Sequence, residues 1–242
     1  MQALLLAAGI GVRLRPITSR IPKCLVPLNN RPLLDIWLKR MKDNNFSPVF
    51  LNTYYLADQV KNFIKASPYK KFVSIIDEVE LCGTAGTLFS VQNRLIKNEP
   101  LLMLHADNLS MFCIEDFIAA HNARPESCDM TMMLFHTDAP NTCGIVGIDN
   151  RGVMVAYEEK PHESQSNLAN AAIFILEYSL IKELSEKYPL AKDFCQEILP
   201  KLIGRVNTYK NNVYHRDIGS IQSYEMAIND MAKNRDSWKT FL

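Results

Sequence analysis

The chain has 242 residues, of which 48% are hydrophobic and 22% are charged, and its formal net charge is +1. This composition is ordinary for a globular protein, and the length suits one large α/β domain rather than two full-sized domains. The small net charge excludes the broad basic field that nucleic-acid binding needs, so any anion-binding site must be local.

The six cysteines form no Cys-x-x-Cys pair and show no spacing typical of a zinc site. We expect reduced, mostly buried thiols. The N-terminus begins with an apolar strand pattern instead of a signal segment, and no apolar run reaches the roughly eighteen residues that span a bilayer. These features predict a cytoplasmic chain without a membrane partner.

A glycine-rich loop follows the first apolar run, at residues 4–6. A short continuous apolar run is typical of a strand buried on both faces of a parallel sheet. Gly9 and Gly11 allow the backbone to turn sharply and bring its amides close to an anion. Arg13 and Lys23 add positive charge. The loop therefore predicts a phosphate site, although it lacks both the third Rossmann glycine and the Walker Gly-Lys-Ser/Thr.

Helical and strand patterns alternate after this loop. The spacing of apolar residues predicts a helix at Pro32–Asn44, a strand at Val49–Thr53, a helix at Ala57–Lys65 and a strand at Phe72–Ile76. A further helix is expected to end near Leu95. Such alternation is typical of βαβ units, whose ligands bind at the carboxyl ends of parallel strands. The sequence thus predicts the α/β class.

The later elements continue this pattern with one hairpin. The sequence predicts a helix at Phe112–His121, strands at Met130–Phe135 and Val153–Glu158, and a helix at Leu180–Tyr188. It further predicts a helix broken by Pro200 over Pro189–Gly204 and a closing helix over Ser223–Asn234 before the tail Asp236–Leu242. Asn150-Arg151-Gly152 predicts the hairpin turn.

An aspartate ends the apolar strand that begins at Leu101. Asp107 lies where phosphates are expected, at the carboxyl edge of a central strand. Mg²⁺ accepts one or two carboxylates and completes its octahedron with phosphate oxygens and water. Asp107 is therefore a predicted metal ligand, while a strand-end turn or a helix N-cap is the alternative role.

The string from Ala7 to Leu28 reads Ala-Ala-Gly-x-Gly-x-Arg-Leu-x-Pro-x-Thr-x-x-x-Pro-Lys-x-Leu-x-Pro-Leu. It resembles the signature of the sugar-1-phosphate nucleotidyltransferases, which make nucleotide sugars, and departs from it at Cys24, where a second proline is common. The resemblance implies one Rossmann-like three-layer domain over residues 1–242 with a mostly parallel mixed sheet. It further implies a nucleotide-binding half at about 1–110 and a sugar-phosphate-binding half at about 111–242, without the β-helix domain of many relatives.

The same resemblance assigns the nucleotide site. Its implied residues are Leu6, Ala8, Gly9, Gly11, Arg13, Lys23, Glu78, Gly83, Thr84 and Asp107. Residues 83–86 match the segment that packs against the nucleobase, and Glu78 matches the reader of the base edge. A carboxylate accepts hydrogen bonds, so guanine is favoured, although a uracil N3–H would also serve. An ordinary helix start with a surface glutamate is the alternative.

The resemblance also assigns the sugar-phosphate site. Gly144, Glu159, Lys160 and Asn170 match the family's sugar-contacting segments, and Asp217 matches a second metal carboxylate. Ala172 stands where a glycine is usual, which leaves the identity of the sugar open. By itself, a Glu-Lys pair at the end of a strand is an ordinary solvated feature.

The implied reaction is attack of a sugar 1-phosphate oxygen on the α-phosphorus of a nucleoside triphosphate, with GTP and a mannose- or heptose-type sugar favoured. Arg13 would hold the β- and γ-phosphates, Lys23 the α-phosphate region and Lys160 the sugar phosphate, with Mg²⁺ on the two aspartates. The chain is expected to be a monomer or homodimer. Uridylyl or thymidylyl transfer to another sugar, cytidylyl transfer to a phospho-alcohol, and a non-catalytic regulatory nucleotide-binding subunit remain alternatives.

Overall fold

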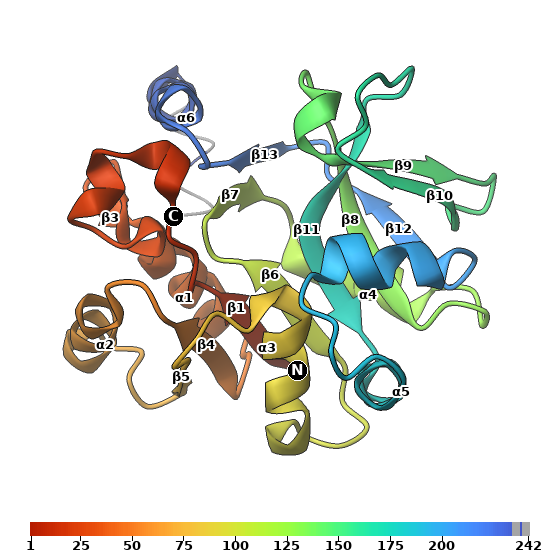
Figure 1. Cartoon of the computed structure of the whole chain (residues 1–242), viewed down its shortest axis with the longest axis horizontal. Helices are drawn as coiled ribbons and strands as arrows, with labels where there is room; N and C mark the ends of the chain where they lie inside the picture. Colours follow the sequence, from red (N-terminus) through yellow and green to blue (C-terminus); the bar gives the residue numbers. More distant parts are fainter. Residues whose placement is uncertain (234–237, 239–242) are drawn as a thin grey trace. The chain divides into compact units, whose positions relative to one another are not determined.

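Two units make up the chain in the computed structural model, which describes residues 1–233 and 238 (Figure 1). Unit 1 comprises residues 1–81, 105–111 and 215–242, and unit 2 comprises residues 82–104 and 112–214. The predicted helix end at Asn234 lies outside the described residues, as does the predicted tail apart from Trp238.

Unit 1 is built on three parallel strands. β1 (Gln2–Leu6) pairs with β4 (Val49–Thr53), and β4 pairs with β5 (Val73–Asp77). The helices α1 (Leu33–Asp43) and α2 (Ala57–Ala66) connect them, and α6 (Ile221–Lys233) follows much later in the sequence. Every residue of β1 and β4 is buried, as their continuous apolar runs predict.

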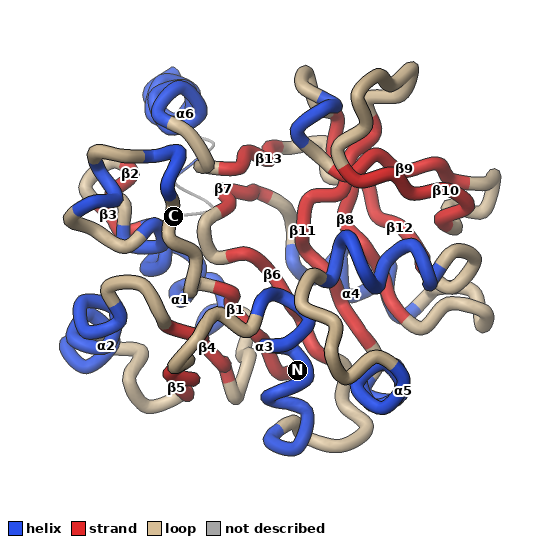
Figure 2. The backbone as a smooth tube through the Cα atoms, viewed as in Figure 1, coloured by secondary structure: helices blue, strands red, loops and turns tan. Residues whose placement is uncertain are grey.

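The loop after β1 contains short elements that the sequence did not reveal. They are the 3₁₀ turns η1 (Val12–Leu14), η2 (Ile17–Ser19) and η3 (Lys23–Leu25) and the strand pair β2 (Pro27–Leu28) and β3 (Arg31–Pro32). Figure 2 shows the short helical and strand segments that lie between β1 and α1. Elements this short have no apolar period to detect.

A second small sheet in unit 1 joins β7 (Asn108–Met111) to β13 (Tyr214–Asp217). Helix α1 holds β7, since Trp37 Nε1 donates to the carbonyl of Asn108 at 2.8 Å and Arg40 Nη1 donates to that of Ser110 at 2.6 Å. The sequence predicted one strand through Asn108. Instead, the chain turns at residues 106–107 and a new strand begins.

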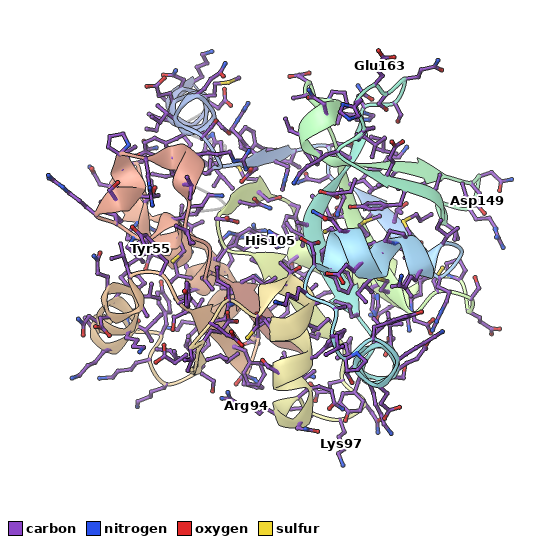
Figure 3. The ribbon with its side chains drawn as sticks, in the orientation of Figure 1. Tyr55, Arg94, Lys97, His105, Asp149 and Glu163 are labelled. Atoms are coloured by element: carbon purple, nitrogen blue, oxygen red, sulfur yellow. The ribbon has the colours of Figure 1, made fainter. Side chains whose placement is uncertain are left out.

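Unit 2 is built around the long strand β11 (Leu168–Leu176). β11 pairs antiparallel with β6 (Leu101–His105), β8 (Met130–His136) and β9 (Gly144–Ile148). β10 (Met154–Glu159) forms the predicted hairpin with β9, and Figure 3 shows Asp149 in its turn. The predicted α/β fold with a mixed sheet is therefore confirmed.

The remaining elements of unit 2 are mostly helical. They are α3 (Gly83–Val91), η4 (Gln92–Arg94), α4 (Ile114–Asn122), η5 (Pro140–Thr142), α5 (Tyr178–Lys187), the π-helical turn η6 (Phe194–Ile198) and η7 (Leu199–Leu202). The change from η6 to η7 occurs beside Pro200 and confirms the predicted break.

One strand of unit 2 was missed. β12 (Val206–Lys210) runs parallel to β8 although its sequence, VNTYK, is mostly polar. The buried Asn207 explains this, because its amide donates to the Ala120 carbonyl and to Thr131 Oγ1 at 3.1 and 3.3 Å. A satisfied polar residue occupies a core position there, which a hydrophobic pattern does not detect.

All six cysteines are free, but the prediction that most are buried was wrong. Only Cys24 and Cys128 are buried, and Cys113 is exposed. Within residues 1–233 and 238, no helix combines the length and apolar composition needed to cross a bilayer.

Candidate functional site

The glycine-rich loop begins at the carboxyl end of β1. Leu6 and Ala8 are buried, whereas Gly9 is exposed. Gly11 adopts a left-handed conformation with φ of 67°, and its carbonyl accepts the hydroxyl of Thr18 at 2.6 Å. A β-carbon on Gly11 would lie 2.9 Å from Thr18 Cγ2 and 3.2 Å from Lys23 Cβ. Glycine at this position therefore lets the loop close on Lys23.

Four charged side chains of unit 1 meet in what we call the carboxylate cluster: Arg13, Lys23, Asp107 and Asp217. The Lys23 ammonium lies 2.6 Å from Asp107 Oδ2 and 3.2 Å from Asp217 Oδ1. Arg13 Nη2 lies 3.6 Å from the other oxygen of Asp217. Residues far apart in the sequence are thus brought together, and one ammonium bridges both predicted metal carboxylates.

Backbone contacts hold the segments that carry Asp107 and Asp217 next to each other. Asp107 occupies the turn after β6, whose last residue, His105, is labelled in Figure 3. The amide of Ile218 donates to the Asp107 carbonyl at 3.2 Å, which ties the two carboxylate segments together. A β-carbon on Gly219 would lie 2.3 Å from Asp217 Oδ2 and 3.0 Å from Arg13 Nη2. Gly219 therefore leaves room for the carboxylate.

Burial and charge oppose each other within the cluster. Burial by itself would raise the pKa of Asp107, but the neighbouring Lys23 ammonium and His105 hold that pKa below its ordinary value. Burial would likewise lower the pKa of Lys23, but Asp107 and Asp217 raise it above its ordinary value. Both groups are therefore charged at neutral pH.

The donor set of the cluster fits a hard divalent cation. Two carboxylates already converge on one positive charge, and carboxylate oxygens are preferred ligands of Mg²⁺. The described residues contain no group of three or more His, Cys, Asp or Glu side chains that could hold a metal. Two carboxylates suit Mg²⁺, since phosphate oxygens and water supply its remaining ligands.

Glu78 also belongs to unit 1 and is 9% exposed. Its Oε1 accepts a hydrogen bond from Asn52 Nδ2 at 2.9 Å, and Asn52 Oδ1 accepts from the Ala7 amide at 2.6 Å. Asn52, at the end of β4, thereby connects the predicted base reader to the glycine-rich loop. The fixed carboxylate is an acceptor, whereas a freely solvated surface glutamate would be mobile.

Gly83 and Thr84 lie in unit 2 at the start of α3. Gly83 has a φ of 76°, and a β-carbon there would lie 2.4 Å from the Lys192 carbonyl oxygen. The Thr84 hydroxyl accepts from the Phe194 amide at 2.7 Å. Both residues thus contact the chain at the start of η6, and their contact with a nucleobase stays a prediction.

A second group, which we call the Tyr157 cluster, comprises Gly144, Tyr157, Glu159, Asn170 and Cys195 of unit 2. Glu159 pairs with Gly144 across the β9–β10 hairpin, and the Tyr157 hydroxyl donates to Glu159 Oε2. The Asn170 amide donates to Cys195 Sγ at 3.4 Å and accepts from the Ala172 amide at 2.8 Å. Three predicted sugar-site residues are therefore brought together.

Two residues beside this cluster have positive φ without being glycine. Lys160 has a φ of 50° and Ala172 a φ of 53°. Such conformations are strained and concentrate at functional sites. Lys160 Nζ lies 3.6 Å from Glu159 Oε1, and its amide donates to the Cys143 carbonyl at 3.0 Å. The backbone thus holds the predicted phosphate-binding lysine next to the predicted sugar-binding glutamate.

Sequence reasoning missed Asn52, Tyr157 and Cys195. Asn52 had a detectable signal, because a polar residue ends an otherwise apolar buried strand. Tyr157 also had one, because it is two residues before Glu159 on a strand and so shares its face. Cys195 had none, since its place in the cluster depends on the π-helical turn.

Comparison with solved structures identifies the fold. The chain superposes on a Bacillus anthracis protein crystallised with sucrose with a TM-score of 0.81 at 20% identity, covering 95% of this chain and 94% of that one. HddC from Yersinia pseudotuberculosis gives a TM-score of 0.78 at 24% identity, covering 95% and 99%. These proteins share the α/β architecture of the present chain.

The sequence itself identifies the family. The model of the nucleotidyl transferase family matches residues 2–234, and the chain belongs to that family. A curated relative, mannose-1-phosphate guanylyltransferase catalytic subunit beta of Drosophila pseudoobscura pseudoobscura, is 30% identical over 228 residues, which cover 92% of this chain and 60% of the relative. The chain spans about 60% of the length of the first curated relatives it matches.

Proposed function

We propose that the chain transfers a nucleoside monophosphate from a nucleoside triphosphate, preferentially GTP, to a mannose- or heptose-type sugar 1-phosphate. This proposal rests on one observation: the Lys23 ammonium, which follows the glycine-rich loop, donates to both Asp107 and Asp217. The names of the curated relatives, mannose-1-phosphate guanylyltransferases, support the choice of substrates.

The proposed step forms one phosphorus–oxygen bond and breaks another. A phosphate oxygen of the sugar 1-phosphate attacks the α-phosphorus, and the bond from that phosphorus to the bridging oxygen of the β-phosphate breaks. Pyrophosphate leaves with the bonding electrons. The attacking phosphate is already ionised at neutral pH, so the step needs no general base.

The main task of the protein is to overcome repulsion between two polyanions. Like unit charges about 4 Å apart repel by roughly 4 kcal/mol at an effective dielectric constant near 20. Arg13, with 71% of its side chain exposed, is available to the β- and γ-phosphates. Lys23 would serve the α-phosphate region and Lys160 the sugar phosphate.

Asp107 and Asp217 would hold the Mg²⁺ ion. When bound, this ion supplies positive charge that stabilises the charge developing on the phosphate oxygens. The Lys23 ammonium occupies the point on which both carboxylates converge, so loading of the cation would release Lys23 toward the phosphates. Glu78, fixed by Asn52, would accept the adjacent N–H donors of guanine.

A panel assay tests this function. The purified chain is incubated with Mg²⁺ and each pairing of GTP, UTP, dTTP, ATP or CTP with mannose, heptose or glucose 1-phosphate, and pyrophosphate release is measured. We expect the greatest kcat/KM with GTP and a mannose- or heptose-type sugar. Faster turnover with UTP or dTTP would contradict the assigned base, and absence of turnover in every pairing would contradict the function.

A Glu78→Gln variant isolates the base reader. The substitution keeps the side-chain shape and replaces one carboxylate acceptor by an amide donor. We expect the preference for GTP over UTP to fall about tenfold, which corresponds to the loss of one hydrogen bond to a charged group. An unchanged triphosphate profile would remove Glu78 from this role.

A further inference from the structure

The Tyr157 cluster contains a hydroxyl group to which the proposed reaction assigns no part. We propose that Tyr157 is a positioning residue that fixes the Glu159 carboxylate to accept hydroxyl groups of the sugar, and so determines sugar specificity. This inference rests on the proposed function and names a further residue of its sugar site.

Strand geometry brings the two side chains together. Tyr157 and Glu159 are two residues apart on β10, so they stand on the same face of the hairpin. The phenol donates to Oε2 of the carboxylate, while Oε1 lies 3.6 Å from Lys160 Nζ. Each carboxylate oxygen thus has a fixed neighbour and keeps a lone pair for another donor.

Gly144 provides the space for this contact. A β-carbon there would lie 2.2 Å from the Tyr157 hydroxyl oxygen and 2.7 Å from Glu159 Oε2. Both distances are far inside van der Waals contact, so any side chain at 144 would displace the phenol, the carboxylate or both. The absence of a side chain at Gly144 is therefore a condition for the geometry of Glu159.

The surroundings of the phenol keep it protonated, so that it can donate. Burial, together with the nearby Cys195 and Glu159, raises the pKa of Tyr157. Loss of solvent around the half-buried Cys195, together with the nearby Glu159 and Asp193 carboxylates, raises the pKa of its thiol to about 12. The phenol and the thiol are both protonated at neutral pH. The Tyr157 hydroxyl is therefore available as the donor to Glu159, and the Asn170 amide donates to the neighbouring thiol of Cys195.

The charge pattern identifies the ligand class. An ionised carboxylate accepts hydrogen bonds and repels phosphate oxygens, so the partner of Glu159 must be a donor such as a sugar hydroxyl. The exposed Lys160 ammonium is next to it and attracts the phosphate of the same ligand. A neutral phenol can orient the carboxylate without cancelling its charge. A further cation in the same place would cancel that charge.

Replacement of Tyr157 by Phe removes only the hydroxyl. We expect the KM for the preferred sugar 1-phosphate to rise roughly five- to tenfold, while kcat and the KM for GTP stay within about twofold. Tyr209→Phe is the matched control, because Tyr209 is a half-buried tyrosine of unit 2 that packs on Phe117. The control is expected to leave both KM values unchanged.

Deoxy sugar 1-phosphates distinguish positioning from packing. In the wild-type chain, loss of the sugar hydroxyl that Glu159 accepts should lower kcat/KM about tenfold, and in Tyr157→Phe the same loss should cost only about threefold. If the phenol only packs, the ratio of kcat/KM for the full sugar to kcat/KM for the deoxy sugar should be the same in Tyr157→Phe as in the wild-type chain. Gly144→Ala should disturb the contact between Tyr157 and Glu159 from the paired strand, and should therefore also reduce the ratio of kcat/KM for the full sugar to that for the deoxy sugar.

The outcomes separate the inference from the function. Wild-type turnover with the same deoxy ratio in Tyr157→Phe and Gly144→Ala would overturn the inference and leave the proposed function intact. Absence of wild-type turnover throughout the substrate panel would overturn both. A reduced ratio in both variants, with GTP parameters unchanged, would establish the positioning role.

Discussion

The carboxylate cluster of unit 1 and the Tyr157 cluster of unit 2 differ in the partners that their carboxylates have. In the former, one ammonium with 9% of its side chain exposed holds two carboxylates, and an exposed arginine stands beside them. In the latter, a phenol donates to one carboxylate and an amide donates to a thiol. Charge is balanced by charge in the first group, and acceptors are matched to neutral donors in the second.

This difference follows the chemistry of the two proposed substrates. Triphosphate oxygens carry full charges and bind cations, and the carboxylate cluster holds the Lys23 ammonium between Asp107 and Asp217. Sugars differ from one another largely in the number and orientation of their hydroxyls, and a fixed hydrogen-bond acceptor discriminates between them. Ion pairs therefore suit the first cluster, and a network of neutral donors suits the second.

The largest effect is expected from Asp107→Asn. The substitution removes one of the two carboxylates that fit the cation and leaves Lys23 with Asp217 alone. We expect kcat/KM to fall by about 10³-fold, within the range for loss of one electrostatic group at a reacting centre. Asp58→Asn is the control, because 95% of that side chain is exposed. Turnover of Asp107→Asn near the wild-type value would remove the metal assignment.

Replacing Lys23 by Met tests whether the cluster also stabilises unit 1. The change leaves two carboxylates facing each other without their shared ammonium. We expect the free energy of unfolding at pH 7 to fall by about 2–3 kcal/mol, at the lower end for a broken buried pair because Asp217 is half exposed. Urea unfolding measures it. Lys39→Met, which breaks a surface pair on α1, should cost less than about 0.5 kcal/mol.

The same variant has a pH dependence of known sign. The pKa of Asp107 is lowered in the folded chain, so its contribution to stability is present above the ordinary carboxyl pKa and disappears as pH falls through the lowered value. Without Lys23, burial dominates and that pKa rises. The stability difference between wild type and Lys23→Met should therefore shrink as pH falls from 7 toward 3. A difference that grows on acidification would contradict the ion-pair assignment.

Two glycines sharpen the role of the backbone in the first cluster. A methyl group on Gly219 would lie against Asp217 Oδ2, whereas a β-carbon on Gly9 meets no atom within 4 Å. We expect Gly219→Ala to lower kcat/KM about tenfold to thirtyfold through the displaced carboxylate. Gly9→Ala should keep the wild-type unfolding free energy and raise only the KM for GTP. A kcat/KM of Gly219→Ala near the wild-type value would contradict this expectation.

The smallest effect is expected in the Tyr157 cluster. Cys195→Ala removes the sulfur that accepts the Asn170 amide at 3.4 Å, a weak hydrogen bond. We expect the KM for the sugar 1-phosphate to rise about two- to threefold and the KM for GTP to stay constant. Steady-state kinetics at saturating concentration of the second substrate measures both. A change confined to the KM for GTP would show that the thiol belongs to a different site.

The sequence predicted those parts of the fold that have a strong period. The strand Val49–Thr53 is found at its predicted residues, and the helix expected at Pro32–Asn44 differs by one residue at each end. β7 and β12 were missed for physical reasons. The turn at Asp107 interrupts a single apolar run, and β12 buries an asparagine whose amide is satisfied by tertiary contacts.

The candidate site divides in the same way. Arg13, Lys23 and Asp107 could be predicted because charge and strand ends mark them in the sequence. The bridging of Asp107 and Asp217 by Lys23 could not, since it depends on contacts over 84 and 194 residues. Tyr157 was missed because a tyrosine in a strand usually packs, although its place two residues before Glu159 put both side chains on one face; the structure shows its hydroxyl donating to that carboxylate.

Calorimetric titration of GTP with Mg²⁺ into wild type, Asp107→Asn and Tyr157→Phe tests the division of labour between the two clusters most directly. We expect the Kd for GTP to rise at least about tenfold in Asp107→Asn and to change less than about twofold in Tyr157→Phe. Equal weakening in both variants, or unchanged affinity in Asp107→Asn, would contradict the assignment of the carboxylate cluster to the triphosphate.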